Sequence, residues 1–266
     1  MAARDIAYVE LYAKDKQRAA QHLVSGLGFA CVADSVAPDR SSLLLREGSA
    51  HLVVTSGPAT WKFLDAHGEG IADIALVCTD VTATVERALR TGARRAGSVR
   101  GNPILSGAGG LTHTLLPAAR TPRGWPAGHR WVELPPRTGR PAGRVRRLDG
   151  VTIGVGGARA ADCARLYRDG FGLVPRRSEL ELAGSQGELK LTLKTDNVGA
   201  IHQLSFVVDD MVHTAHELRS NGAEFEVPDP PEGAGPLRLV GRSPHLGDTL
   251  RLELVEAVDQ PRLAAG

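Results

Sequence analysis

Residues 71–93 read IADIALVCTDVTATVERALRTGA, and residues 201–223 read IHQLSFVVDDMVHTAHELRSNGA. Each stretch begins with an apolar run typical of a strand and continues with apolar residues at helical spacing. Each predicted helix is preceded by a capping Asp and followed by a Gly suited to the left-handed conformation: Asp80 and Gly92 in the first stretch, Asp209 or Asp210 and Gly222 in the second. The two stretches therefore predict the same strand-helix unit twice.

A second pair of similar stretches lies at residues 6–29 and 151–173. They read IAYVELYAKDKQRAAQHLVSGLGF and VTIGVGGARAADCARLYRDGFGL, each a strand, a helix and a Gly-aromatic stop. Short alternating runs bounded by Gly, Pro and Asp lie between the units and read as further strands, at residues 42–45, 51–55, 111–116, 188–193, 237–240 and 249–255. The chain is thus four copies of one unit.

These repeats predict an α+β fold in which four βαβββ units pair into two barrel-like modules. A stretch rich in Pro, Gly and Arg is the natural linker between the modules. The predicted division is an N-terminal module at 1–120 (units 1–66 and 67–120), a linker at 121–145, a C-terminal module at 146–258 (units 146–197 and 198–258) and a tail at 259–266. Each module should enclose one barrel-like cavity within its curved sheet, with the helices outside.

Composition excludes several classes of function. The net charge is only +2, and the one basic run lies at residues 137–147, so we expect no nucleic-acid partner. No uncharged apolar run is long enough to cross a membrane, and the first residues lack an apolar signal core. The three cysteines are scattered singly, which excludes a disulfide framework or a thiolate metal site. We expect a cytoplasmic protein with no membrane partner.

Five segments in order resemble one known family. VELYAKDKQRAAQHLVSGLGF, HGEGIADIALVCTDV and LTHTLLP resemble the N-terminal module of the 4-hydroxyphenylpyruvate dioxygenases and hydroxymandelate synthases, and LDGVTIGV and HQLSFVVDDM resemble their C-terminal module. These enzymes belong to the vicinal oxygen chelate superfamily, which includes glyoxalases and bleomycin resistance proteins. The resemblance covers nearly the whole chain and implies the vicinal oxygen chelate fold and a homodimer.

The resemblance also implies where an iron site would lie. In that family two histidines and one carboxylate of the C-terminal module hold the iron. Their positions correspond here to Gly150, Gln203 and Glu253. His202 is adjacent, but residues of a strand alternate between faces, so it should point away from the cavity unless the register slips. We therefore expect no cofactor, and iron only if the register is different.

Strand alternation also predicts which side chains line the C-terminal cavity: Gly150, Thr152, Gly154, Gln203, Ser205, Arg251 and Glu253. Arg251 is a candidate clamp for a ligand carboxylate, Glu253 a candidate acid or base, and Thr152, Gln203 and Ser205 candidates for orienting a ligand. The alternative is that Arg, Glu and Gln only satisfy one another as buried polar groups.

The N-terminal module has candidates of its own in Tyr8, Glu10, Asp73 and His113. Glu10, Asp73 and His113 are residue types that form carboxylate-rich metal sites. The resembled enzymes carry such residues in a module that binds no metal, which favours a structural role. His213 and His216 are three residues apart, yet their charged neighbours favour a solvated helix face, and His51 reads as a partly buried strand residue.

Three functions are compatible with these residues. The first is a binding or resistance protein that holds a small, anionic or aromatic metabolite without metal. The second is a metal-independent isomerase or lyase of specialised metabolism that uses Glu253 as acid or base. The third is a non-haem iron dioxygenase with an unorthodox site built from Gln203 or His202 together with Glu253.

Overall fold

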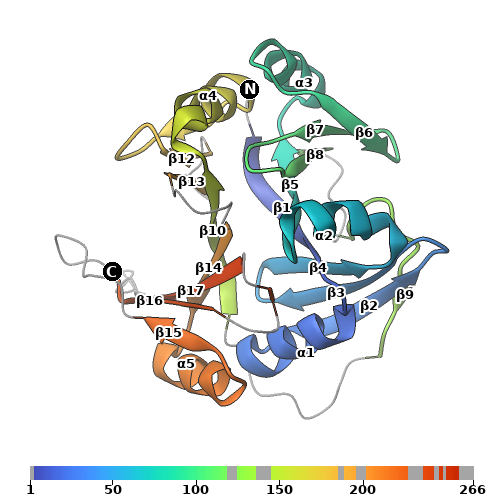
Figure 1. The fold of residues 1–266 in the computed structure, drawn as a ribbon, viewed down its shortest axis with the longest axis vertical. Helices are drawn as coiled ribbons and strands as arrows, with labels where there is room; N and C mark the ends of the chain where they lie inside the picture. The colour runs from blue at the N-terminus through green and yellow to red at the C-terminus, as the bar shows by residue number, and fades with distance from the viewer. Residues whose placement is uncertain are drawn as a thin grey trace, which may run out of the picture.

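The structure, a computed structural model, describes residues 3–118, 125–135, 145–184, 189–195, 202–226, 236–242, 246–247 and 250–257. Residues 121–124 and 136–144 of the predicted linker, the predicted boundary at 197 and the predicted tail lie outside these ranges. The described chain forms two large β-sheets with helices packed beside them (Figure 1). This is the predicted α+β architecture.

The first sheet joins two units by antiparallel pairing of their opening strands, β1 (Ala3–Tyr12) and β5 (Gly70–Cys78). The remaining elements of these units are α1 (Lys16–Leu27), β2 (Ala30–Val36), β3 (Ser41–Glu47), β4 (Ala50–Ser56), η1 (Pro58–Thr60), α2 (Trp61–His67), α3 (Val81–Arg90), β6 (Arg95–Val99), β7 (Asn102–Ser106) and β8 (Thr112–Pro117). A short strand, β9 (Val132–Glu133), extends the sheet beside β2 and lies within the predicted linker. The strand order is β6-β7-β8-β5-β1-β4-β3-β2-β9.

The second sheet repeats this plan, with β10 (Val145–Val155) antiparallel to β14 (His202–Val208). Its other elements are η3 (Gly157–Arg159), α4 (Ala160–Arg165), η4 (Leu166–Gly170), β11 (Val174–Pro175), β12 (Glu181–Ala183), β13 (Lys190–Thr195), α5 (Met211–Ser220), β15 (Glu224–Glu226), β16 (Arg238–Arg242) and β17 (Leu250–Glu256). The order is β11-β12-β13-β10-β14-β17-β16-β15. In both sheets each unit contributes one half.

The predicted helix caps are present. Asp80 Oδ1 accepts a hydrogen bond from the backbone N–H of Ala83 at 2.9 Å, and Asp210 Oδ1 accepts one from His213 at 2.8 Å, so Asp210 rather than Asp209 is the cap. Strand β2 and helix α2 were not among the predicted elements, since neither has a strong period in the sequence. No helix within the described ranges is long and apolar enough to cross a bilayer.

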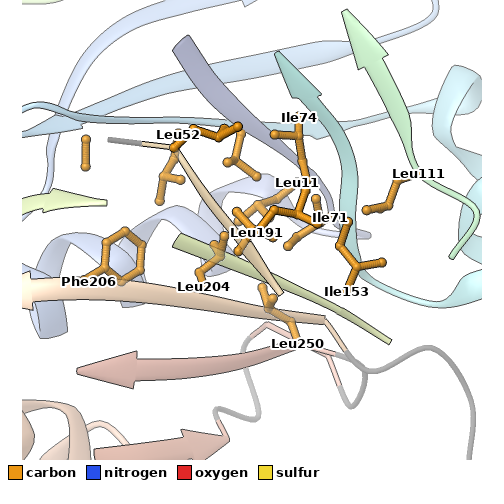
Figure 2. Close-up of a cluster of buried hydrophobic side chains, with 14 of the residues drawn as sticks. Leu11, Leu52, Ile71, Ile74, Leu111, Ile153, Leu191, Leu204, Phe206 and Leu250 are labelled. Atoms are coloured by element: carbon orange, nitrogen blue, oxygen red, sulfur yellow. The ribbon is translucent and has the colours of Figure 1, made fainter. Parts of the chain in front are cut away.

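The hydrophobic core lies between the two sheets. Figure 2 shows side chains of the first sheet, such as Leu11 and Ile74, meeting Ile153, Leu204 and Leu250 of the second, and all of these are at least 97% buried. Most of the buried apolar residues of the central strands therefore turn toward the other module. Because successive strand residues point to opposite faces, the polar residues between them turn away from this core.

Helices α1 and α5 pack closely at one end of this core (Figure 1). Gly26 of α1 faces Leu218 of α5, and a Cβ at position 26 would lie 2.1 Å from Leu218 Cδ2. Only a glycine lets the two helices approach this closely without displacing Leu218. The pair joins unit 1 to unit 4, and so the two modules share one core.

Candidate functional site

The polar face of the C-terminal sheet is formed by the central strands β10, β14 and β17. Gly150 lies opposite Ser205, which lies opposite Glu253, and Thr152 lies opposite Gln203, which lies opposite Arg251. Directly paired residues point to the same face of a sheet. The structure thus brings the sequence candidates Thr152, Gln203, Ser205, Arg251 and Glu253 together in two adjacent rows.

Glu253 is held from two sides. Its Oε1 accepts a hydrogen bond from Arg238 Nη1 at 3.0 Å, and its Oε2 accepts one from the hydroxyl of Ser205. Glu253 is only 7% exposed and Ser205 5%, so this carboxylate is a buried acceptor that is already paired with a guanidinium. Both carboxylate oxygens are therefore engaged within the protein.

Two arginines lie side by side on this face, with Glu224 of β15 on the far side of Arg242. Arg242 of β16 lies directly opposite Arg251 of β17, so two guanidinium groups share one face. Like charges directly opposite one another destabilise a sheet. In addition, Arg251 Nε is buried and has no hydrogen-bond partner among the described residues. This pair is suited to an anion that would neutralise both groups.

A second ion cluster surrounds Gly150. Asp149, in a bulge between Leu148 and Gly150, is buried and accepts a hydrogen bond from Lys190 Nζ at 2.8 Å, while Arg147 Nη1 lies 2.8 Å from the same oxygen. A Cβ at Gly150 would lie 3.0 Å from the Cβ and the carbonyl oxygen of Lys190. Strand β13 therefore fills the space beside Gly150.

The three residues that the resemblance assigns to the iron-ligand positions do not fit ferrous iron. Gly150 has no ligand atom, Gln203 offers a neutral amide, and both oxygens of Glu253 are engaged, one of them by a cation that would repel a metal. Across the described residues, no group of three or more His, Cys, Asp or Glu side chains is placed to hold a metal ion. We derive no chemistry through iron at this face.

His202 lies on the other face of β14. Its ring is near Gly109, which also contacts the core residue Ile153. Burial, and to a smaller extent the charge of His67, lower the pKa of His202 to about 4. Its Nδ1 has no hydrogen-bond partner within the described ranges. The ring therefore lies away from Gln203 and Glu253, as strand alternation predicts.

The N-terminal candidates do not form one cluster. Glu10 and Asp73 lie opposite each other on β1 and β5, with Tyr8 on the same face. His113 lies on the opposite face of β8, where Nδ1 contacts the carbonyl oxygen of Ile74 at 3.1 Å and Nε2 contacts Tyr167 Oη at 2.9 Å. Glu10, Asp73 and His113 therefore do not meet as the metal site that their residue types would allow, because alternation along β8 turns His113 into the core.

The other histidines have the surroundings that the sequence predicts. His213 and His216 are exposed on α5, and His213 Nε2 lies 4.0 Å from Glu217 Oε1. His51 is half-buried on β4, and burial followed by the charge of Arg46 lowers its pKa to about 4. None of these rings joins the polar face of the C-terminal sheet.

Sequence reasoning missed three residues of this face: Arg238, Arg242 and Asp149. The predicted strand at 237–240 stops before Arg242, and nothing in RLVGR shows which strand lies beside it. The ion pair of Asp149 with Lys190 depends on the parallel pairing of β10 with β13, a strand about 40 residues later in the chain. The available signal was the period of two in the sequence, which places Arg238, Val240 and Arg242 on the same face of one strand.

Comparison with known proteins gives the same architecture. No protein-family profile matches the sequence. A protein of Caenorhabditis elegans is 25% identical over 123 residues, which span 42% of this chain and 34% of that protein. The chain therefore covers only about a third of the length of this relative.

Two solved structures match almost the entire chain. A mutant form of 4-hydroxymandelate synthase from Streptomyces coelicolor superposes with a TM-score of 0.78 and 26% identity, covering 96% of this chain and 93% of that one. A fusion of a xylose isomerase-like TIM barrel with a 4-hydroxyphenylpyruvate dioxygenase superposes with a TM-score of 0.69 and 17% identity, covering 99% of this chain and 50% of that one. The chain thus has the vicinal oxygen chelate fold, with its modules paired as in 4-hydroxymandelate synthase.

Proposed function

We propose that the protein binds a small anionic metabolite on the polar face of its C-terminal sheet, as a binding or resistance protein without metal. The observation that carries this proposal is the pair of arginines, Arg242 and Arg251, placed directly opposite each other with Arg251 Nε buried and unpartnered among the described residues. A carboxylate accepting from both guanidinium groups would remove their repulsion and satisfy the buried N–H.

The neighbouring residues support an oriented ligand. Gln203 lies beside Arg251 in the same row, and Thr152 lies beside Gln203. Both side chains are half-buried and can donate and accept hydrogen bonds, so they are placed to contact the polar groups of an acid held by Arg251. The two similar structures are named for 4-hydroxymandelate and 4-hydroxyphenylpyruvate, which are aromatic acids with one carboxylate. We take these two acids as the first ligands to test.

Glu253 supports binding more than acid-base catalysis. A general base must be free to take a proton, and its pKa should lie near the working pH. Glu253 is instead paired with Arg238 and accepts from Ser205, so both of its oxygens already have partners within the protein. A metal-independent isomerase or lyase using Glu253 is therefore the less favoured proposal, and an iron dioxygenase is not proposed, since the donor set does not fit iron.

Isothermal titration calorimetry of the purified full chain with the two acids tests the proposal. We expect saturable binding of at least one acid, and Arg251→Gln should weaken it by about tenfold to a hundredfold, because a charge-assisted hydrogen bond is worth about 1.5–3 kcal/mol. Arg95→Gln, on the exposed strand β6 of the other module, is the matched control and should bind like the native protein.

Glu253→Gln separates binding from catalysis. If the protein only binds the acid, this variant should keep affinity within about threefold, whereas an acid-base enzyme would turn over its substrate and lose a hundredfold or more of its rate. Equal affinity in native protein and Arg251→Gln, or no binding of either acid, would contradict the proposal. A cytoplasmic homodimer is part of the same proposal, and light scattering of the purified protein tests the dimer.

A further inference from the structure

The N-terminal sheet also has a face turned away from the shared core. A separate small cluster of buried side chains lies there, formed by Tyr8, Ala33, Leu44, Val53 and Ala75, with Trp131 packed against it. Trp131 belongs to residues 125–135, which run beside β2, where the backbone N–H of Leu134 donates to Val32 O at 2.9 Å. Two carboxylates, Glu10 and Asp73, interrupt this apolar surface.

The two carboxylates are neighbours with incomplete hydrogen bonding. Glu10 lies directly opposite Asp73 in the β1–β5 register. The hydroxyl of Thr55 donates to Glu10 Oε1 at 2.6 Å, and that of Thr112 donates to Asp73 Oδ1 at 2.6 Å. Asp73 is 6% exposed, and its Oδ2 makes no hydrogen bond of normal geometry in the described part of the chain, although Thr114 of β8 lies near enough to the carboxyl to lower its pKa. A buried carboxylate oxygen without a donor is costly unless something else supplies one.

The surrounding charges are mostly negative. Burial raises the pKa of Asp73 to about 7; the hydrogen bond from Thr112 lowers this pKa, and the charge of Glu10 raises it. Burial also raises the pKa of Glu10. The other charges that face the pair are Arg40 and Asp39 in the loop between β2 and β3, which lie 3.4 Å from each other and are exposed. Asp39 and Arg40 offset each other's charge, so Glu10 and Asp73 are the groups that favour a cation at this place.

Aromatic rings adjoin the two carboxylates. Tyr8 and Tyr12 flank Glu10 on the same strand and face, at positions two residues away on either side. Glu10, Tyr12 and Thr112 are half-buried rather than buried, so the pair can be reached from solvent. Carboxylates combined with aromatic faces are the groups that recognise organic ammonium ions.

We propose that this face of the N-terminal sheet binds a small organic cation, a primary ammonium, whose N–H groups are accepted by Asp73 Oδ2 and Glu10 while the rings of Tyr8 and Tyr12 lie beside it. An ammonium group would supply the donor that Asp73 Oδ2 lacks among the described residues. A divalent metal is less suited, because only two carboxylates meet here and His113 points into the core. The site is independent of the arginines on the C-terminal sheet.

Calorimetry with benzylamine as the probe, and with benzyl alcohol as its uncharged counterpart, tests the proposal on the full chain at pH 7.5. We expect benzylamine to bind saturably at least tenfold more tightly than benzyl alcohol, and Trp131, near the site, to report binding by its fluorescence. Asp73→Asn and Glu10→Gln should each weaken benzylamine binding at least tenfold. Asp65→Asn, an exposed acid on α2, is the matched control and should leave it unchanged.

Folding of the variants is checked by far-UV circular dichroism. Asp73→Asn replaces a carboxyl that burial favours in its neutral form, so this variant should fold even if Glu10→Gln does not. Equal binding of benzylamine and benzyl alcohol, full benzylamine affinity in folded Asp73→Asn, or displacement of benzylamine by equimolar Ca²⁺ would overturn the proposal.

Discussion

Replacing Tyr167 with Phe tests how the two modules are locked together. Tyr167 of η4 in the C-terminal module is fully buried, and its hydroxyl contacts His113 of β8 in the N-terminal module. The carbonyl of Ile74 can only accept, so His113 Nδ1 carries the proton and Nε2 is the acceptor. The hydroxyl of Tyr167 therefore donates to His113 and accepts from the backbone N–H of Ala108 at 3.2 Å.

The Tyr167→Phe substitution removes one oxygen and leaves two buried groups without partners. His113 Nε2 and the Ala108 N–H would each lose a hydrogen bond in a site that water does not reach. An unsatisfied buried donor or acceptor costs about 1–3 kcal/mol, so we expect the free energy of unfolding to fall by about 2–4 kcal/mol. The ring itself still fills its space against Phe171, so little packing is lost.

Urea unfolding followed by far-UV circular dichroism measures this loss. Tyr12→Phe is the control, since Tyr12 is half-buried on the other face of the N-terminal sheet, and its free energy should change by less than about 0.5 kcal/mol. A His113→Gln, Tyr167→Phe double-mutant cycle should then give a coupling of about 1 kcal/mol or more. A loss below 0.5 kcal/mol for Tyr167→Phe would refute the proposed role of this hydroxyl.

Two further predictions concern the core. Gly26→Ala places a methyl group 2.1 Å from Leu218 Cδ2, and the forced shift should lower the free energy of unfolding, measured in urea, by about 1–3 kcal/mol. Gly156→Ala is the control, because a Cβ there meets no atom within 4 Å, and its free energy of unfolding should hardly change. Equal effects of the two substitutions would contradict the close approach of α1 and α5. Acidification should destabilise the protein through His113, because burial lowers its pKa to about 4 and the unfolded chain, with an ordinary value near 6.5, binds the proton first as the pH falls. At pH 5 the His113 contribution alone amounts to about 2 kcal/mol relative to neutral pH, and Asp73, whose raised pKa acts in the opposite direction, contributes about the same amount with the opposite sign. His113→Gln should show a correspondingly flatter dependence of unfolding free energy on pH, and an unchanged slope would argue against a neutral buried ring.

The resemblance and the repeats predicted much of the candidate site. The cross-strand rows through Gln203 and Arg251 follow from period-two alternation once each strand is aligned on its repeat. What alignment of single strands does not predict is the partner on the next strand. Arg238 meets Glu253, and Arg242 meets Arg251, only because β16 pairs antiparallel with β17 in one particular register.

By itself, the sequence determined the repeated strand-helix units, their capping residues such as Asp80, and which face of each strand is apolar, because these depend on residues near one another in the chain. The tertiary structure decided that His113 lies on the opposite face from Glu10 and Asp73 and contacts Tyr167. It also decided that Glu253 forms an ion pair with Arg238. Such contacts depend on the register and packing of segments far apart in the sequence, which local spacing does not encode.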